Sequence, residues 1–129
     1  MSATASWLDQ EKNVTTFTIS GEWTVHQILE AAQKWRDMLT EVNDPVYNVM
    51  DFSSAVGIPA DFLPSFPVIA RNLTHPNYSG GVVVVRDRLL KRFLEAYASV
   101  YEEYTYATTI EDAMRMIREK QVLESIKTV

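Results

Sequence analysis

Apolar and polar residues are distributed along the chain with a period that changes between that of strands and that of helices. Residues 6–9 and 14–20 have the β-prone, partly alternating pattern of half-buried strands, and the polar turn at 10–13 predicts a hairpin between them. Gly21 is expected to end the second strand. The chain therefore begins, by this interpretation, with an antiparallel pair.

The first helix has the clearest signal. Thr24 and Gln27 have the spacing of a capping box, in which each side chain binds the backbone amide of the other residue. The apolar residues that follow recur with the helical period and form one stripe: Val25, Ile28, Leu29, Ala32, Trp35, Leu39 and Val42. The sequence Asn-Asp-Pro at 43–45 is expected to end this helix.

The middle of the chain predicts one short helix and one buried strand. A turn at 59–63 and a helix from about 64 to 73 are expected, because the prolines in this region are tolerated only near a helix start. Residues 82–85 are entirely apolar and predict a central strand. His-Pro-Asn and the glycines at 80–81 are assigned to the loop before it.

The last third predicts a helix, a short strand at 104–107 and a final helix. Asp87 is the expected cap of the first of these helices, and Thr108 with Glu111 forms a capping box for the last one. The buried face of the first is expected to comprise Leu90, Phe93, Leu94, Tyr97, Ala98 and Tyr101.

The final helix carries two apolar stripes. Its core stripe comprises Ile110, Ala113, Met114 and Ile117. Val122, Ile126 and Val129 fall on nearly the opposite face, and one straight helix cannot bury both sets against one sheet. Either the helix ends near Lys120 with a frayed tail, or the second stripe contacts another chain. We favour the second interpretation, a homodimer contact.

The element order β-β-α-β-α-β-α-β-α predicts an α/β fold with a four- to five-stranded, mostly parallel sheet and an antiparallel strand at one edge. A chain of 129 residues is expected to form a single domain, residues 1–129. The net charge of −5 argues against duplex nucleic acid as a partner. The apolar runs are too short to span a membrane and no leader is evident, so a cytoplasmic location is expected.

Candidate chemistry is sparse. The chain has no cysteine, and its two histidines, His26 and His75, have no paired ligands, so neither a metal nor a cofactor is expected. Trp23, at a strand-to-helix turn, either stacks on a ligand or packs at the helix entrance, and both interpretations remain open. The basic cluster at 86–92 is either an anion or acidic-partner site or a solvated face, and only Arg86 is well placed for a crevice.

The most informative segment is the strand predicted at 46–52, whose apolar run breaks at Asp51 and is followed by Ser53 and Ser54. Polar groups at the end of a buried strand are expected at the carboxyl edge of the sheet, where ligands of open α/β sheets bind. We interpret Asp51 as an acceptor for loop amides. The alternative is an enzyme that uses Asp51 with Ser53 or Arg86.

The strand ending in Asp51-Phe52-Ser53, the Val-rich strand that leads into a helix, and the Thr-capped last helix with Glu-Asp-Ala at 111–113 are similar to the STAS family. This domain is shared by sulfate transporters and anti-sigma-factor antagonists. The resemblance implies a STAS-like, non-enzymatic domain that binds a protein partner. An alternative that the architecture allows is an apolar small-molecule or lipid-binding domain, with a cavity beneath Phe62, Phe66 and Trp23.

One departure from the family concerns its phosphorylation switch. In anti-sigma-factor antagonists the helix after this strand opens with Asp-Ser-Ser-Gly, and the partner kinase phosphorylates the first serine. The corresponding residues here, 59–62, read Pro-Ala-Asp-Phe. Ala60 has no hydroxyl group, so the resemblance implies that this switch is absent. With the register shifted by one residue, Asp61 would supply a fixed negative charge in its place.

Overall fold

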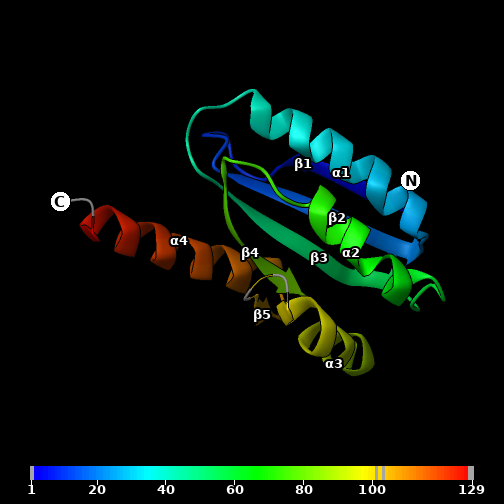
Figure 1. Cartoon of the computed structure of the whole chain (residues 1–129). Helices are drawn as coiled ribbons and strands as arrows, with labels where there is room; N and C mark the ends of the chain where they lie inside the picture. Colours follow the sequence, from blue (N-terminus) through cyan, green and yellow to red (C-terminus); the bar gives the residue numbers. More distant parts are fainter. Residues whose placement is uncertain (1, 101, 103, 128–129) are drawn as a thin grey trace.

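A computed structural model describes residues 2–100, 102 and 104–127. Its centre is a five-stranded sheet in the order β1-β2-β3-β4-β5, in which β1 is antiparallel and the other four strands are parallel (Figure 1). The strands are β1 (Ala3–Trp7), β2 (Val14–Glu22), β3 (Val46–Val56), β4 (Tyr78–Val84) and β5 (Thr105–Ala107). The predicted α/β class, element order and antiparallel edge strand are confirmed.

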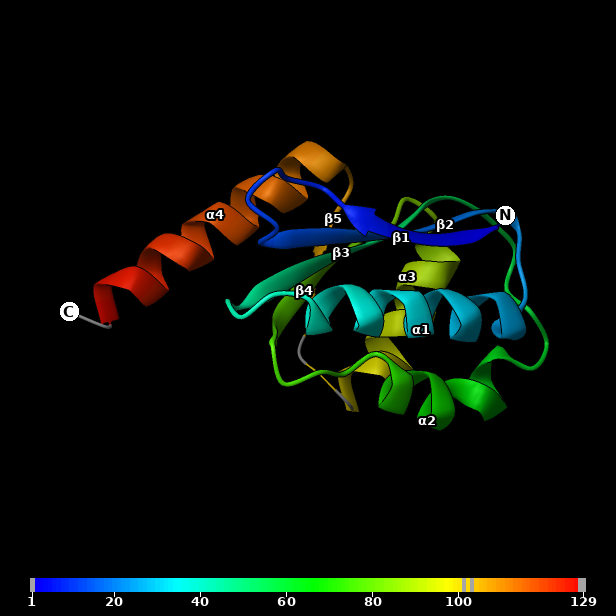
Figure 2. The same ribbon diagram turned by 90° about the horizontal axis from the view of Figure 1, so that it is seen from above.

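The helices are α1 (Val25–Thr40), α2 (Phe62–Asn72), α3 (Arg88–Tyr97) and α4 (Ile110–Lys127), and a short 3-10 turn (Ala98–Val100) follows α3. The first three cover one face of the sheet, while α4 lies on the other face (Figure 2). The larger core, between the sheet and α1 to α3, includes Phe17, Ile28, Trp35, Met50, Val83 and Leu90. The smaller core, beneath α4, includes Tyr47, Val49, Val84, Ala113 and Ile117.

The start of α1 agrees with the sequence. The Gln27 amide donates to the Thr24 hydroxyl over 3.2 Å, and the Thr24 amide donates to the Gln27 side chain over 3.0 Å. Trp35 is fully buried, and its indole N–H donates to the Thr15 hydroxyl over 2.9 Å. A buried indole needs such a partner, so this bond fixes how α1 lies on the sheet.

The hairpin differs from its predicted bounds. The first strand is Ala3–Trp7 rather than 6–9, because the Asp9 carboxylate accepts the amides of Asn13 and Val14, both at 3.0 Å, and forms the turn itself. The second strand does not end at Gly21 but continues to Glu22. Gly21 pairs with Ala55 of β3 and has a φ of +63°, which glycine adopts without strain.

The middle of the chain also differs in detail. Gly80 and Gly81 belong to β4 rather than to the preceding loop. A Cβ at Gly81 would lie 2.7 Å from the Tyr78 hydroxyl, so here glycine allows close packing within a strand. Helix α2 begins at Phe62 rather than near residue 64, because the Ser65 amide already donates to the Asp61 carbonyl over 3.1 Å.

The last elements begin and end differently from the prediction. The cap of α4 is Thr109, one residue later than predicted, and its hydroxyl accepts the Asp112 amide over 3.1 Å. The strand before it spans only Thr105–Ala107. The helix does not end near Lys120, because it continues to Lys127 and Glu124 accepts a hydrogen bond from the Tyr47 hydroxyl.

The third helix is capped as expected, since the Asp87 carboxylate accepts the Leu90 amide over 2.9 Å. Tyr97 was assigned to the buried face of this helix but is 44% exposed. Tyr101, assigned to the same face, lies outside the described residues. Within the described part of the chain, none of the helices has the length and apolar character needed to cross a membrane. No group of potential metal ligands was found among the same residues.

Candidate functional site

The acidic residue at the centre of the predicted site lies inside β3, because this strand continues to Val56. Thr18 pairs with Asp51 and Ser20 pairs with Ser54, so β3 contains one extra residue over this interval. Such a β-bulge interrupts the ladder and leaves an amide to be satisfied otherwise. Asp51, only 6% exposed, accepts the Ser53 amide over 2.9 Å and the Ser53 hydroxyl over 2.6 Å. The acceptor role predicted for Asp51 is confirmed, within the strand rather than at its end.

Trp23 joins two connections that are distant in the sequence. Its indole N–H donates to the Gly57 carbonyl over 3.0 Å, and its ring makes edge-to-face contacts with Phe52 and Phe62, with centroids 5.9 and 5.1 Å apart. The side chain is buried. Trp23 therefore packs beneath the connection between β3 and α2 and holds it by a hydrogen bond, and its ring lies in the core.

The structure brings two of the other candidate residues together. Arg86 follows β4, is exposed, and donates through Nε to the Thr108 carbonyl over 3.2 Å. Ser53 and Arg86 both line a hollow of about 320 Å³ at the carboxyl edge of the sheet, beside the first turn of α4. Asp51 does not line this hollow, and Ser54 is exposed on the strand beyond the bulge. Of the two pairs that the enzyme alternative named, the structure brings Asp51 together with Ser53 and not with Arg86.

Sequence reasoning missed an apolar surface on α3. Leu90 and Leu94 are buried, but Leu89 is 72% exposed, and Phe93 and Tyr97 lie on the same side of the helix. The ring centroids of Phe93 and Tyr97 are 4.9 Å apart. The helical spacing 89-93-97 is a signal for this second stripe. Of its two members that were assigned to the core, Phe93 packs partly against it, whereas Tyr97 is exposed.

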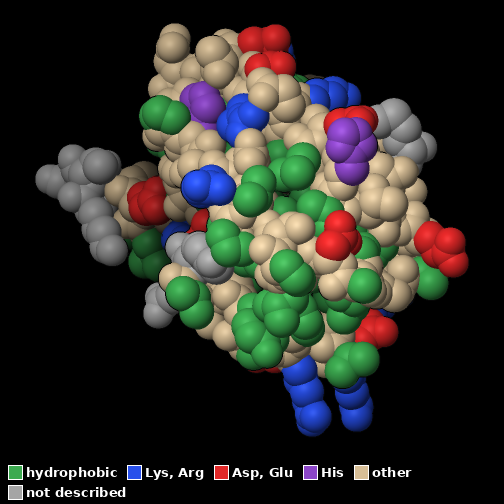
Figure 3. Space-filling model, turned by 45° about the vertical axis from the view of Figure 1, so that its right-hand side comes forward, with side chains coloured by type: hydrophobic (Ala, Val, Ile, Leu, Met, Phe, Trp, Pro, Cys, Tyr) green, Lys and Arg blue, Asp and Glu red, His purple; other side chains and the backbone are tan. Residues whose placement is uncertain are grey.

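Helix α2 continues this surface. The Phe93 ring lies 5.6 Å from that of Phe62, whose neighbour Leu63 is 40% exposed. We call Leu63, Leu89, Phe93 and Tyr97 the α2–α3 surface. Apolar side chains gather over this part of the molecule, and basic side chains extend from its edge (Figure 3). The aromatic contacts thus continue from the buried core to an exposed face.

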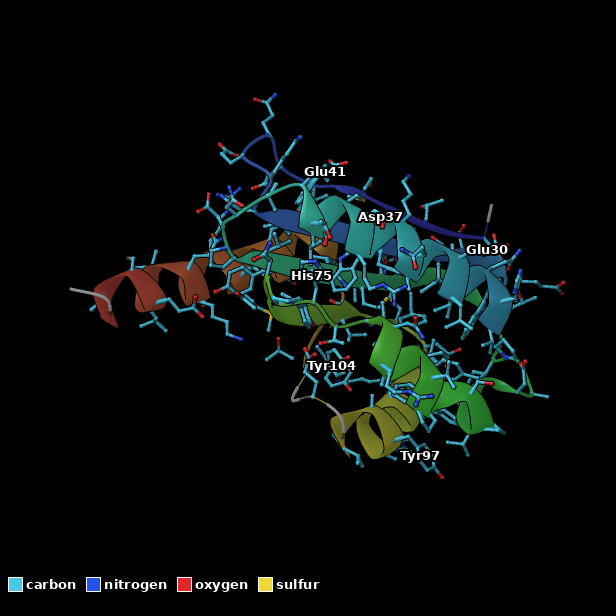
Figure 4. The ribbon with its side chains drawn as sticks, turned by 45° about the horizontal axis from the view of Figure 1, so that its top comes forward. Glu30, Asp37, Glu41, His75, Tyr97 and Tyr104 are labelled. Carbon is cyan, nitrogen blue, oxygen red and sulfur yellow. The ribbon has the colours of Figure 1, made fainter. Side chains whose placement is uncertain are left out.

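Charged residues are distributed unevenly around this surface. Arg88, Lys91 and Arg92 are all exposed on α3. Glu30, Asp37 and Glu41 follow α1 along the opposite side of the molecule from Tyr97 (Figure 4). Glu95 is exposed on α3 as well, so this helix carries three basic side chains and one acidic side chain in a chain with a net charge of −5.

An apolar cavity lies beneath α2 and α3, in the core. Its lining includes Phe62, Phe66, Leu94 and Tyr104, and its volume is about 40 Å³. Pockets for small organic ligands usually have volumes of roughly 300–1,000 Å³. Trp23, which was expected above such a cavity, does not line it.

Comparisons with solved structures identify this arrangement. An anti-sigma factor antagonist from Mycobacterium paratuberculosis aligns with a TM-score of 0.61 and 20% identity, over 91% of this chain and 95% of that one. An uncharacterized DUF3478-family protein with a SpoIIAA-like fold, from Shewanella loihica PV-4, aligns with a TM-score of 0.62 and 12% identity, over 88% and 94% of the two chains. The fold is STAS-like.

At these identities the likeness shows the fold of the STAS-like domain alone. Neither the protein-family models nor the curated proteins give a match to its sequence. The roles of individual side chains must therefore be argued from this structure.

The turn before α2 contains residues 59–62, which the sequence analysis compared with the phosphorylation motif. Ala60 is exposed in this turn, and the Phe62 amide donates to the Pro59 carbonyl over 3.0 Å. Asp61 is exposed directly before the helix, and its side chain makes no capping hydrogen bond. A carboxylate at this position adds negative charge beside a helix N-terminus, where it is favoured.

Proposed function

We propose that this chain is a non-enzymatic STAS-like domain that binds a protein partner through the α2–α3 surface. The observation that carries the proposal is that Leu89 and Tyr97 of α3 are exposed on the same side as the half-buried Phe93, and that Leu63 of α2 is exposed as well. Contiguous apolar patches on monomeric proteins often mark interaction sites. Aromatic side chains are common anchors of such sites because they bury a large area with few rotatable bonds.

The charges near this surface define the partner's chemistry. Arg88 and Arg92 lie on α3 beside the apolar stripe, while the acidic side chains of α1 lie on the far side. A partner that presents apolar anchors with an acidic rim would be attracted in the correct orientation. This complementarity supports an acidic protein surface as the occupant.

We further propose that binding is not controlled by phosphorylation of the turn before α2. The residues 59–62 offer no hydroxyl group, and Asp61 holds a permanent negative charge at the helix start. A fixed carboxylate cannot be switched by a kinase, although it supplies charge at the place where a phosphoserine would. Control by another route is compatible with this proposal.

The small volume of the core cavity supports a partner surface over an apolar-ligand carrier. At about 40 Å³ the space beneath Phe62 and Phe66 is several times smaller than the pockets of small-molecule binders. A ligand would have to separate α2 from α3 before it could enter. Partner binding at the outer surface requires no such rearrangement.

We also propose that α4 pairs with a second copy of this chain. Val122, Leu123 and Ile126 are about 60% exposed, on the half of α4 that projects beyond the sheet (Figure 1). Val122 and Leu123 also line a groove along α4 that continues to Met114 and Leu8. The apolar surface therefore runs along much of the helix, and antiparallel pairing of two copies would cover it in a two-fold interface. Val129, the last residue of the predicted stripe, lies outside the described residues.

The partner proposal is tested by photo-crosslinking. A benzophenone amino acid at Leu89 is expected to form an adduct in the cells that produce the protein, whereas the same group at Lys34, on exposed α1, is expected to form none. The captured protein is then titrated by calorimetry with wild-type chain and with Leu89→Ser. Loss of at least tenfold in affinity is expected, as for an interface hot spot. Equal adducts at both positions, or unchanged affinity for Leu89→Ser, would contradict the proposal.

A further inference from the structure

The connection between α2 and β4, residues 73–77, is attached to the C-terminal end of α1. The Asn77 side-chain amide donates to the Leu39 and Val42 carbonyls, over 2.9 and 2.8 Å. Carbonyls at a helix C-terminus lack partners within the helix, and Asn77 supplies donors to this end of α1 from a distant segment. The Asn77 carbonyl also accepts the Val46 amide over 2.7 Å, at the start of β3. Asn77 therefore joins three elements.

The backbone amide of Asn77 is held by a histidine. It donates to Nδ1 of the His75 ring over 3.0 Å. The other ring nitrogen, Nε2, lies 3.0 Å from the Thr40 hydroxyl oxygen. That hydroxyl donates its own proton to the Arg36 carbonyl over 2.9 Å, so it can only accept from the ring. Together these bonds require the neutral tautomer of His75, with the proton on Nε2 and a lone pair on Nδ1.

Protonation of this ring removes the acceptor for Asn77. A charged imidazole carries an N–H group at both nitrogens, so Nδ1 would direct a proton at the Asn77 amide. Histidine side chains ordinarily gain this proton as the pH falls below about 6.5. Two N–H groups that face each other repel, and the amide must then move away from His75. One proton thus converts an attractive contact into a repulsive one.

The charged ring also has favourable surroundings. His75 lies close to the C-terminal end of α1, which carries Asp37 and Glu41 (Figure 4). The last turn of this helix has no basic residue, so its partial negative charge favours a cation there. In the described part of the chain the ion pairs found do not include His75. Both protonation states therefore have favourable contacts, and they differ in whether Asn77 is held.

Other titratable and charged groups surround the connection on every side. They come from α1, the α1–β3 connection, α2, β4 and the segment before β5, and comprise Arg36, Asp37, Glu41, Asp44, Arg71, Tyr78, Glu102 and Tyr104. Arginine side chains do not lose their charge in proteins. Burial raises the pKa of the Tyr78 and Tyr104 hydroxyls well above their usual range, so both stay neutral. Burial also raises the pKa of the Glu102 carboxyl, whose titration must be distinguished from that of His75.

We propose that His75 is a pH-sensitive switch, which holds the connection between α2 and β4 against α1 when the ring is neutral and releases it when the ring is charged. Regions held by few hydrogen bonds open locally while the rest of a protein stays folded, so the sheet need not unfold. The inference concerns contacts within one chain and does not depend on the proposed partner or on the pairing of α4.

Nuclear magnetic resonance of the 129-residue chain tests the switch. At about pH 7.5 the nitrogen shifts of the His75 ring are expected to show the proton on Nε2. The amide proton shift of Asn77 is expected to change with the same midpoint as the His75 ring. Protection of this amide from hydrogen exchange, corrected for the intrinsic rate, should fall about tenfold between about pH 7.5 and pH 5.5.

Three variants separate the ring from its surroundings. His75→Asn retains an oxygen that can accept the amide two residues later, as in an Asx-turn, but cannot gain a proton, so Asn77 should stay protected at both pH values. His75→Ala should leave this amide unprotected at both. His26→Asn changes the other histidine of the chain, exposed on α1, and should respond to pH as wild type does. Thermal unfolding verifies that each variant retains the fold.

Three results would overturn the inference. The first is a neutral ring with its proton on Nδ1, and the second is an Asn77 amide that does not follow the titration of His75. The third is a pH response that persists in His75→Asn, which would assign the transition to Glu102 instead.

Discussion

The Tyr78 hydroxyl donates a hydrogen bond to Glu102 over 2.6 Å, and this bond ties β4 to the segment that follows α3. Glu102 is partly buried, and burial raises the pKa of its carboxyl above the ordinary value of 4.5, although Tyr78 and Lys120 act in the opposite direction. Burial also raises the pKa of the Tyr78 hydroxyl well above its usual range. Tyr78 therefore remains a donor throughout the accessible pH range.

This relationship predicts a pH dependence of stability. A carboxyl group whose pKa is higher in the folded than in the unfolded state stabilises the fold fully below the unfolded pKa, near 4.5. That contribution is lost as pH rises through the folded pKa. The unfolded chain releases the proton at lower pH than the folded chain, so rising pH favours the unfolded state over this interval. We expect the unfolding free energy of wild type, minus that of Glu102→Gln, to fall from pH 4 upward in urea titrations.

A control for this experiment is available in the exposed turn between β1 and β2. Glu11→Gln removes the same charge at an exposed position. The difference in unfolding free energy between wild type and Glu11→Gln is expected to vary much less over the same pH range. A Glu102→Gln difference that rises with pH would mean that Tyr78 and Lys120 outweigh burial.

The bulge in β3 predicts unequal costs for two neighbouring substitutions. Asp51→Ala removes a buried carboxylate that accepts two hydrogen bonds and leaves the Ser53 amide unsatisfied, so about 3 kcal/mol of unfolding free energy should be lost. Ser53→Ala removes only the hydroxyl and should cost about 1 kcal/mol. Ser54→Ala, at an exposed position, should cost less than about 0.5 kcal/mol. Equal costs for Asp51→Ala and Ser54→Ala in urea unfolding would refute this account of the bulge.

The turn before α2 predicts the absence of one modification. Incubation with an anti-sigma-type serine kinase and ATP is expected to leave residues 59–62 unmodified, because none of them has a hydroxyl group. Ala60→Ser restores an acceptor in the exposed turn and is the matched control. Phosphopeptide mass spectrometry provides the measurement. Phosphorylation of wild type at Ser53, Ser54 or Ser65 would show that the phosphorylated serine lies at another position and is not absent.

The proposed pairing of α4 predicts a dimer in solution. The chain of 129 residues should have twice the monomer mass in light scattering at high micromolar concentration. The double substitution Val122→Ser with Ile126→Ser should give a monomer, because these exposed side chains contribute little to the fold of one chain but would be buried in the pair.

Surface substitutions are preferable to truncation after Lys120, which would also remove the contact of Glu124 with Tyr47. Leu63→Ser, on the α2–α3 surface, is the control and should leave the mass unchanged. If wild type is a monomer at high micromolar concentration, α4 is not a contact between copies.

The elements that local chemistry specifies were predictable from the sequence. The capping box of Thr24 and Gln27 and the apolar run from Val46 determine α1 and the start of β3, and both are confirmed. The continuation of β3 past Phe52 was not predictable, because its pairing with β2 depends on contacts made only in the fold. The cap of α4 was placed one residue early because Thr108 and Thr109 satisfy the same local rule.

The candidate site was predictable only in part, for a related reason. The basic residues from Arg86 onward are close together in the sequence. Arg115 lines a hollow with Arg86 and Lys91 only because the fold brings α4 next to the start of α3. The exposure of Tyr97 was missed because this residue fits either of two adjacent helical faces, whereas Phe93 packs partly against the core as predicted. Periodicity identifies apolar stripes but not which of them the rest of the chain covers.

The shortness of β5 has a consequence for the order in which the structure opens. This strand has three residues and pairs with β4 alone, through Val82, Val83 and Val84. Local opening in proteins proceeds through cooperative units, and those with the fewest ties separate at the lowest free energy. The pairing of β5 with β4 is shorter than those of β2 with β3 and of β3 with β4, so we expect β5 to separate from the sheet at a lower free energy than the strands inside it.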